Sequence, residues 1–147
     1  GTDQWRWVKE KIGQKVDFRI IISSIQFLAI GHGWESWNNF PLQRAKLIKF
    51  IDKANLNHTL ILSGDRHRAG IYEIKSESGK RISEVTSSSL NASFPNDEEN
   101  GPLRLGNTYV EENYGVISID SENRQLIASI RDIDGEIVRK LIITNKN

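Results

Sequence analysis

Two short, almost wholly apolar runs constrain the fold of this chain more than any other feature. Residues 18–24 and 59–63 are rich in β-branched side chains and lack the strict alternation of a half-solvated strand. Such runs are typical of strands covered on both faces, as in parallel or mixed sheets. Between them, residues 41–55 carry apolar side chains at helical spacing, and Pro41 suits a first helical turn. The order strand, loop, helix, strand predicts a βαβ unit with a right-handed crossover.

Two amphipathic helices are predicted in this part of the chain. The first covers residues 2–12, with Thr2 as its cap and Gly13 as its stop. Its apolar face combines Trp5, Val8 and Ile12. In the second helix, the expected inner stripe comprises Leu42, Ala45, Ile48 and Ile51, widened by Leu47 and Ala54.

After the βαβ unit the pattern changes to short strands. Five are predicted, at residues 71–74, 82–86, 114–119, 125–130 and 137–143. Asp134-Gly135 is a hairpin signal between the last two strands, and residues 87–112 form a long polar stretch of the kind that is functional or mobile. We therefore expect an α/β fold in one domain. Residues 1–75 supply its strand-helix-strand part and residues 76–147 its β-rich part.

Composition limits the classes of partner and site. The chain has 147 residues, a formal net charge of +1 and no cysteine. Near-neutral charge gives no field that favours nucleic acid, so no nucleic-acid partner is expected. No apolar run approaches the roughly 20 residues that cross a bilayer, so no membrane span is expected. The lack of cysteine excludes disulfides and thiolate metal ligands within these residues.

The apolar strand that ends in Gly64-Asp65-Arg66-His67 is the most informative local feature. In α/β sheets, ligands bind beyond the carboxyl ends of the strands. In an extended backbone, Asp65 and His67 point to the same side and offer a carboxylate oxygen and an imidazole nitrogen to one centre. Such a pair suits Fe, Mn or Zn, and the carboxylate also tolerates Ca. The alternative is a capping aspartate and a surface histidine at an ordinary strand end.

Several longer segments around this tetrapeptide resemble one enzyme family. From Gly1 to about Lys140 the chain is similar to the second half of alkaline phosphatase D (PhoD-like) enzymes, within the calcineurin-like metallophosphoesterases. The loop Trp34-Glu35-Ser36-Trp37 with a following Arg44, and then Gly64-Asp65-Arg66-His67, is more specific than either part alone. Further similar segments are residues 1–7, 21–27, 38–41 and 84–91.

The resemblance implies a sandwich of two sheets flanked by helices, with a multinuclear metal site at the strand ends. The wider superfamily has Gly-His-x-His at its last motif, and Asp65 takes the place of the first histidine, as in the alkaline phosphatase D type. Asp65 and His67 are therefore expected to be metal ligands and catalytic residues. The family's other ligands belong to its N-terminal half, so these residues are expected to hold a fraction of the site and to need that missing half as a partner.

The implied reaction is hydrolysis of a small phosphate ester by metal-activated water. Cations bind phosphoryl oxygens and lower the pKa of a bound water from 15.7 towards about 7. The cofactors implied are divalent or trivalent ions: Fe, Ca, Mn or Zn. Export to the periplasm or the cell exterior is expected from the resemblance alone.

Four further side chains are candidates for the pocket. Trp34 and Trp37 either wall the pocket and stack on the organic group of a substrate or simply pack the loop. Arg44 either reaches a phosphate or ties the loop structurally, and its position within a helix favours the second role. Gln26 lies where the superfamily commonly has a metal-binding histidine, and a supporting or substrate-contacting role is expected for it.

The remaining polar residues near the motif receive structural interpretations. His32 and His58 are expected to be solvated. The stretch that contains Thr86, Ser87, Ser88 and Asn91 is expected to support the Asp65–His67 loop through hydrogen bonds, unless the serines form a plain turn. Arg66 and Arg68 alternate away from the ligands and are expected to pair with carboxylates nearby.

Two competing functions remain open at this stage. One is a non-catalytic β-rich binding module in which residues 64–67 form a structural turn. The other is a nuclease of the same superfamily, which the near-neutral charge disfavours.

Overall fold

The first half of the chain forms two helices and a four-stranded sheet. The computed structural model describes residues 1–94, 98–99 and 101–145. The helices are α1 (Thr2–Gly13) and α2 (Pro41–Asp52), with a short 3-10 turn, η1 (Trp37–Asn39), before α2. The strands of this sheet are β1 (Ile20–Ile22), β2 (His58–Ser63), β3 (Ala69–Lys75) and β4 (Arg81–Ser87).

The order in this first sheet is β1-β2-β4-β3. β1 and β4 both run parallel to β2, with Ile21 opposite Ile61 on one side and Val85 opposite Leu62 on the other. β3 returns antiparallel to β4. The parallel pairing predicted for the βαβ unit is therefore confirmed. The boundary predicted at residue 75 falls between β3 and β4, which pair within one sheet.

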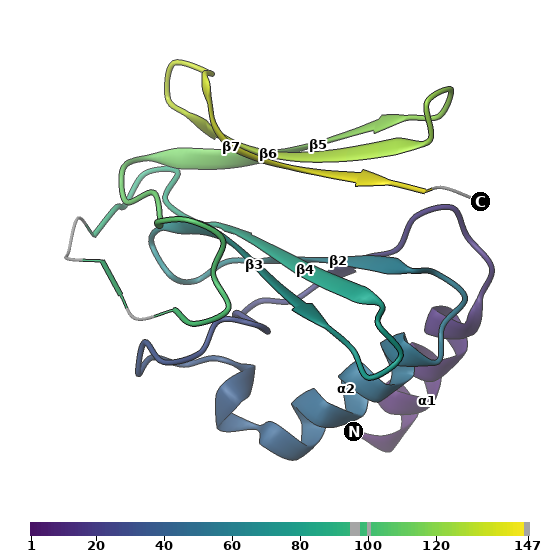
Figure 1. The fold of residues 1–147 in the computed structure, drawn as a ribbon. Coiled ribbons are helices and arrows are strands. Elements are labelled where there is room, and N and C mark those ends of the chain that lie inside the picture. The colour runs from purple at the N-terminus through teal and green to yellow at the C-terminus, as the bar shows by residue number, and fades with distance from the viewer. Residues whose placement is uncertain (95–97, 100, 146–147) are drawn as a thin grey trace.

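The second half adds a separate antiparallel sheet. Its strands are β5 (Asn113–Asp120), β6 (Gln125–Asp132) and β7 (Ile137–Thr144), in that spatial order. Figure 1 shows this sheet stacked over one face of the first sheet, with α1 and α2 against the opposite face. The architecture is thus two stacked sheets with helices on one side, and all five later strands predicted from the sequence lie within β3 to β7.

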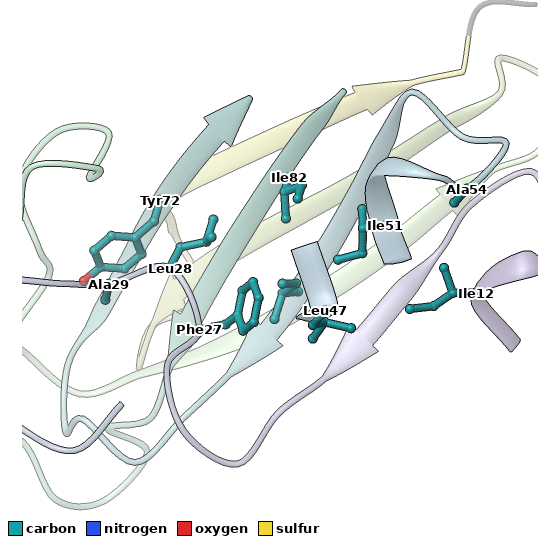
Figure 2. Close-up of a cluster of buried hydrophobic side chains, with 10 residues drawn as sticks. Ile12, Phe27, Leu28, Ala29, Leu47, Ile51, Ala54, Tyr72 and Ile82 are labelled. Atoms are coloured by element: carbon teal, nitrogen blue, oxygen red, sulfur yellow. The ribbon is translucent and has the colours of Figure 1, made fainter. Parts of the chain in front are cut away.

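Each face of the first sheet has its own apolar core. On the helix side, Ile61 and Ile82 pack with side chains of α1, α2 and the segment after β1 (Figure 2). On the other side, Leu60 and Val85 pack against the inner face of β6 and β7. Adjacent residues of β2 thus enter different cores. This explains the absence of a polar face in residues 59–63.

The helices differ from the predictions in two details. Helix α1 has Gly1 at its N-cap and no side-chain capping bond, so the predicted cap by Thr2 is wrong. In α2 the buried side chains are Leu47 and Ile51, continued by Ala54, whereas Leu42 is 82% exposed. The stripe that meets the sheet therefore begins one turn later than predicted, because these three residues, spaced four and three apart, face Phe27 and the first sheet. Among the described residues, neither helix is long and apolar enough to cross a membrane.

Candidate functional site

The Gly64–Arg68 turn connects the carboxyl end of β2 to β3. This end of a strand lies where open α/β sheets place their ligands. Asp65 and His67 both have left-handed backbones, with φ of 72° and 50°. The extended geometry expected for them is therefore wrong, because the chain must reverse between Ser63 and Ala69. Aspartate and histidine tolerate this region better than most residues, but it still costs about 1–3 kcal/mol each and such strain clusters at functional sites.

The imidazole of His67 is fixed by its surroundings. Its Nδ1 lies 2.8 Å from the carbonyl oxygen of Ala92, and its ring stacks on Phe94 with centroids 4.3 Å apart. A carbonyl can only accept, so Nδ1 carries a proton, and the tautomer that fits this contact has its lone pair on Nε2. This is the arrangement in which a histidine binds a cation through one nitrogen and is oriented through the other.

Asp65 supplies a second donor at the same turn. Its side chain is exposed, and no ion pair or hydrogen bond engages its carboxylate among the described residues. A carboxylate and an imidazole fit Fe, Mn or Zn, and the carboxylate fits Ca. Within the described ranges, no three His, Cys, Asp or Glu side chains gather closely enough to hold a metal ion. Two donors are fewer than the four to eight that such cations take.

The two arginines of the turn point towards a carboxylate, as predicted. Arg66 and Arg68 both form ion pairs with Glu99. The hydroxyl of Ser88 accepts from the Arg66 backbone N–H at 3.0 Å and donates to the Arg68 carbonyl at 3.3 Å. The predicted support of the turn by the serine stretch is therefore confirmed for Ser88.

Gln26 lies behind the turn, in the core, and is only 1% exposed. Its Nε2 donates to the Thr86 hydroxyl at 2.9 Å and contacts the Tyr72 hydroxyl at 3.3 Å. Thr86 in turn bonds to Ser63, the last residue of β2, at 2.8 Å. Gln26 thus reaches the end of β2 through a hydrogen-bonded chain, and the substrate contact considered for it has no open surface in this structure.

The two tryptophans of the predicted pocket lie in different environments. Trp34 is 59% exposed, and the guanidinium of Arg66 lies 5.4 Å from its ring centroid, so Trp34 flanks the Gly64–Arg68 turn. Trp37 instead donates from Nε1 to the Ser23 hydroxyl at 3.0 Å and packs edge-to-face on Phe27. Trp34 is therefore the one with a free surface beside the candidate ligands.

Arg44 has the structural contacts expected of it. Its Nε donates to the Phe27 carbonyl at 2.8 Å. Burial lowers the pKa of Arg44, and the nearby charge of Glu84 partly offsets that effect. Arg44 therefore ties the segment after β1 to helix α2.

The sequence interpretation missed Glu84, a fully buried carboxylate in the middle of β4. Its two oxygens accept from the backbone N–H groups of Phe27, Leu28 and Ala29 at 2.7, 2.6 and 3.2 Å. Burial raises the pKa of Glu84, and these three hydrogen bonds oppose the shift. A charged residue in the centre of a predicted strand, between Ile82 and Val85, was the signal that could have revealed it.

His32 is half-buried, contrary to the solvated position expected. Its Nδ1 accepts from the backbone N–H of Trp34 at 3.0 Å. Burial lowers the pKa of His32, and the charge of Arg66 lowers it further. His32 is thus a neutral side chain beside the turn and shapes the loop that carries Trp34.

A groove of about 1080 Å³ runs along α1, β1 and the segment that carries Trp37. β1 is an edge strand of only three residues, and Ile22 is 82% exposed. Trp7 and Phe40 add exposed aromatic surface to the same groove. The open edge and its apolar rim form a face without cover among the described residues.

The comparisons with known proteins assign the family. The model of the PhoD-like phosphatase family matches residues 1–133, so the chain belongs to that family. It is 26% identical to alkaline phosphatase D of Bacillus subtilis (strain 168) over an alignment of length 94 that covers 58% of this chain and 16% of that protein. A solved structure titled "Structure of PhoD" shares the fold with a TM-score of 0.71 and 19% identity, over 98% of this chain and 32% of that one. The chain therefore spans about a third or less of the relatives that it matches.

Proposed function

We propose that this chain contributes the carboxyl-terminal part of a metal-dependent phosphoesterase, with Asp65 and His67 as metal ligands. The observation that carries the proposal is the availability of two donor groups at the Gly64–Arg68 turn. His67 directs its proton-bearing Nδ1 to a carbonyl and keeps Nε2 available, and Asp65 has an exposed carboxylate two residues away. In a PhoD-like chain, these are the donors that a cation site at the end of β2 requires.

Each residue of the candidate site has a proposed role. His67 and Asp65 would hold one or more cations, which supply positive charge for the phosphoryl group and acidify a bound water. Ala92 and Phe94 hold the imidazole in one orientation. Trp34, with one exposed face beside Arg66, would contact the organic group of the ester. The identity of the cation (Fe, Ca, Mn or Zn) follows from ligands that these residues do not supply.

The remaining ligands are proposed to come from the N-terminal half of the same polypeptide. The relatives extend well beyond the span that this chain matches. The open edge of β1 and the apolar groove beside it offer the surface on which such a part would pack. Residues 1–147 would then be the C-terminal portion of one calcineurin-like domain, and export from the cytoplasm is proposed from the family alone.

The protein for the test is a polypeptide that includes the preceding part as well as residues 1–147. Its hydrolysis of 4-nitrophenyl phosphate and bis(4-nitrophenyl) phosphate is measured with and without EDTA. We expect chelator-sensitive hydrolysis. Asp65→Asn and His67→Ala should each lower kcat by more than the 10- to 100-fold typical of residues that only support a metal ligand. The matched control is His58→Gln, at the opposite end of β2, which should retain activity.

Two outcomes would contradict the proposal. Hydrolysis that is absent, or that EDTA does not affect, would favour a binding module in which the Gly64–Arg68 turn is structural. Full metal content in both ligand variants, measured by elemental analysis, would exclude Asp65 and His67 as ligands.

A further inference from the structure

The strongest unassigned feature is an ion cluster directly behind the candidate ligands. Arg66 and Arg68 precede and follow His67, and their side chains are only 10% and 3% exposed. Both guanidinium groups meet the same oxygen, Oε1 of Glu99, with Arg68 Nη2 at 3.6 Å. Thirty-two residues separate His67 from Glu99, so a distant segment holds both neighbours of one candidate ligand.

This contact bears on the backbone of the turn. A single carboxylate links the side chains at positions 66 and 68, and the hydroxyl of Ser88 links the backbone of the same two residues. His67, between them, has a left-handed backbone that persists only where the surroundings determine it. Glu99 and Ser88 thus each contact both residues on either side of His67, and Arg68 also bonds to the Thr108 hydroxyl at 3.3 Å.

The charges in the cluster do not cancel. Glu99 offers one negative charge to two guanidinium groups, whereas Arg104 and Glu98 pair with each other at 3.1 Å. Arg66 Nε and Arg68 Nε are buried and have no hydrogen-bond partner among the described residues. The cluster therefore leaves excess positive charge beside the turn, which favours an anionic group there.

We propose that Glu99 is a positioning residue for the metal site: it holds Arg66 and Arg68 so that the turn between them presents His67 and Asp65 to a shared cation. This inference rests on the proposed function, because it takes Asp65 and His67 as the ligands. It assigns to the polar stretch after β4 a carboxylate that supports the site without touching metal or substrate.

The proposal makes opposite predictions for metal and for substrate. Glu99→Gln removes the charge and keeps the shape, so the turn loses its restraint and affinity for Mn²⁺ falls by about 10- to 100-fold, as for other residues that orient metal ligands. The same change adds net positive charge beside the turn. KM for an anionic ester measured at saturating Mn²⁺ should therefore stay equal or fall, while kcat falls. A merely structural role would lower the folded fraction and leave the Mn²⁺ affinity of the folded molecules unchanged.

The matched control is Glu98→Gln. Glu98 precedes Glu99 in the same segment and pairs with Arg104. It contacts neither arginine of the turn directly and reaches Arg68 only through the Thr108 hydroxyl, which accepts from Arg68 Nη1 at 3.3 Å and for which Gln keeps an acceptor oxygen. Mn²⁺ affinity is measured by competition with a fluorescent chelator, on the polypeptide that includes the preceding part. The amide resonances of residues 64–68 are compared in the 147-residue chain itself, where Glu99→Gln should shift them and Glu98→Gln should not.

The results separate this proposal from the proposed function. If the parent polypeptide shows no chelator-sensitive hydrolysis, the proposed function fails, and the amide resonances still decide whether Glu99 fixes the turn. If hydrolysis is chelator-sensitive but Glu99→Gln keeps Mn²⁺ affinity within about twofold of the parent, well below the effect expected of an orienting residue, Glu99 is not a positioning residue. Glu99→Asp, which keeps the charge, should retain most of the affinity. An equal loss in the Asp and Gln variants would overturn the proposal, because packing rather than charge would then be responsible.

Discussion

The two sheets differ in the polar side chains that they bury. The second sheet, β5 to β7, buries no charged side chain over residues 113–144, and its inner face is mainly aliphatic. The first sheet buries the carboxylate of Glu84 and the amide of Gln26 within or beside its helix-side core. Glu84 accepts hydrogen bonds from the segment that follows β1, and Gln26, which belongs to that segment, donates to Thr86 of β4.

The difference shows which layer carries the site. Buried polar groups destabilise a fold unless they are satisfied, so they persist where they fix something that apolar contacts cannot. In the first sheet they fix the segment after β1 and the end of β2, next to the candidate ligands. The second sheet provides apolar cover for the other face. The candidate site and its apolar cover thus belong to different layers of one stack.

The largest expected effect tests the polar interior. Glu84→Gln replaces one carboxylate oxygen with an NH₂ group, so at least the N–H of Phe27 loses its acceptor even if the amide oxygen faces Leu28 and Ala29. Each buried donor left without an acceptor costs about 1–3 kcal/mol, so we expect a loss of about 1–3 kcal/mol or more in the free energy of unfolding. Urea denaturation followed by circular dichroism measures it.

The control for that substitution is Glu122→Gln, an exposed glutamate in the turn between β5 and β6. It should change stability by less than about 0.5 kcal/mol. A loss below about 1 kcal/mol for Glu84→Gln, less than one unsatisfied donor, would show that the carboxylate is dispensable and would remove the contrast between the two sheets.

A smaller effect is expected in the apolar layer. Ile130 of β6 is fully buried between the sheets. Ile130→Val deletes one methyl group from this core and should cost about 0.5–1.5 kcal/mol, without the penalty of an unsatisfied polar group. The same denaturation measurement applies. An effect as large as that of Glu84→Gln would mean that apolar packing between the sheets contributes as much to stability as the buried polar contacts of the first sheet.

The smallest expected effect is a change of stability with pH that arises from His58 at the start of β2. The second sheet has no histidine and does not contribute to it. His58 is half-buried rather than at the surface, and its Nε2 lies 2.7 Å from the Ser83 hydroxyl. Burial, helped by the charge of Arg81 and opposed by that of Glu73, lowers the pKa of His58 to about 4 from 6.5. The unfolded chain therefore takes up the proton first as pH falls.

As pH falls from about 6.5 to about 4, protonation of His58 in the unfolded chain should lower the free energy of unfolding. The loss should be smaller than the pKa shift alone implies, because the ring keeps some contact with solvent. The measurement compares the free energy of unfolding of the parent chain and of His58→Gln at pH 7, 6 and 5. The variant should show the shallower slope. Parallel curves would mean that the His58 pKa is not lowered in the fold.

The sequence was sufficient to predict most of the helices and strands and to propose where a site lies. The apolar runs at residues 18–24 and 59–63 predicted buried parallel strands, because only a strand covered on both faces can dispense with a polar side. The Gly64-Asp65-Arg66-His67 tetrapeptide after one of them marked the strand end where ligands bind. Pairing of Arg66 and Arg68 with a carboxylate was predicted from their alternation with Asp65 and His67, and it is confirmed although the turn is not extended.

The sequence did not identify the partners that lie far along the chain. Neither Glu84, which bonds 55 to 57 residues away, nor Glu99, which meets the turn from the following segment, could be matched with its partner by local spacing. The stripe that included Leu42 failed for the same reason, whereas the cap assigned to Thr2 failed because the helix begins one residue earlier, with Gly1 at its N-cap. The burial of a side chain depends on which neighbour the helix meets, and helical periodicity does not contain that information.

What the amino-acid sequence determined by itself was the kind of fold, two apolar strands joined through a helix, and the presence of an aspartate and a histidine at a strand end. These are local properties, set by backbone preference and by the spacing of apolar side chains. Only the tertiary structure decided that His67 directs Nδ1 to Ala92, that Asp65 and His67 adopt left-handed backbones, and that the β1 edge stays open. Each of these depends on contacts between segments far apart in the chain, and only folding brings such segments together.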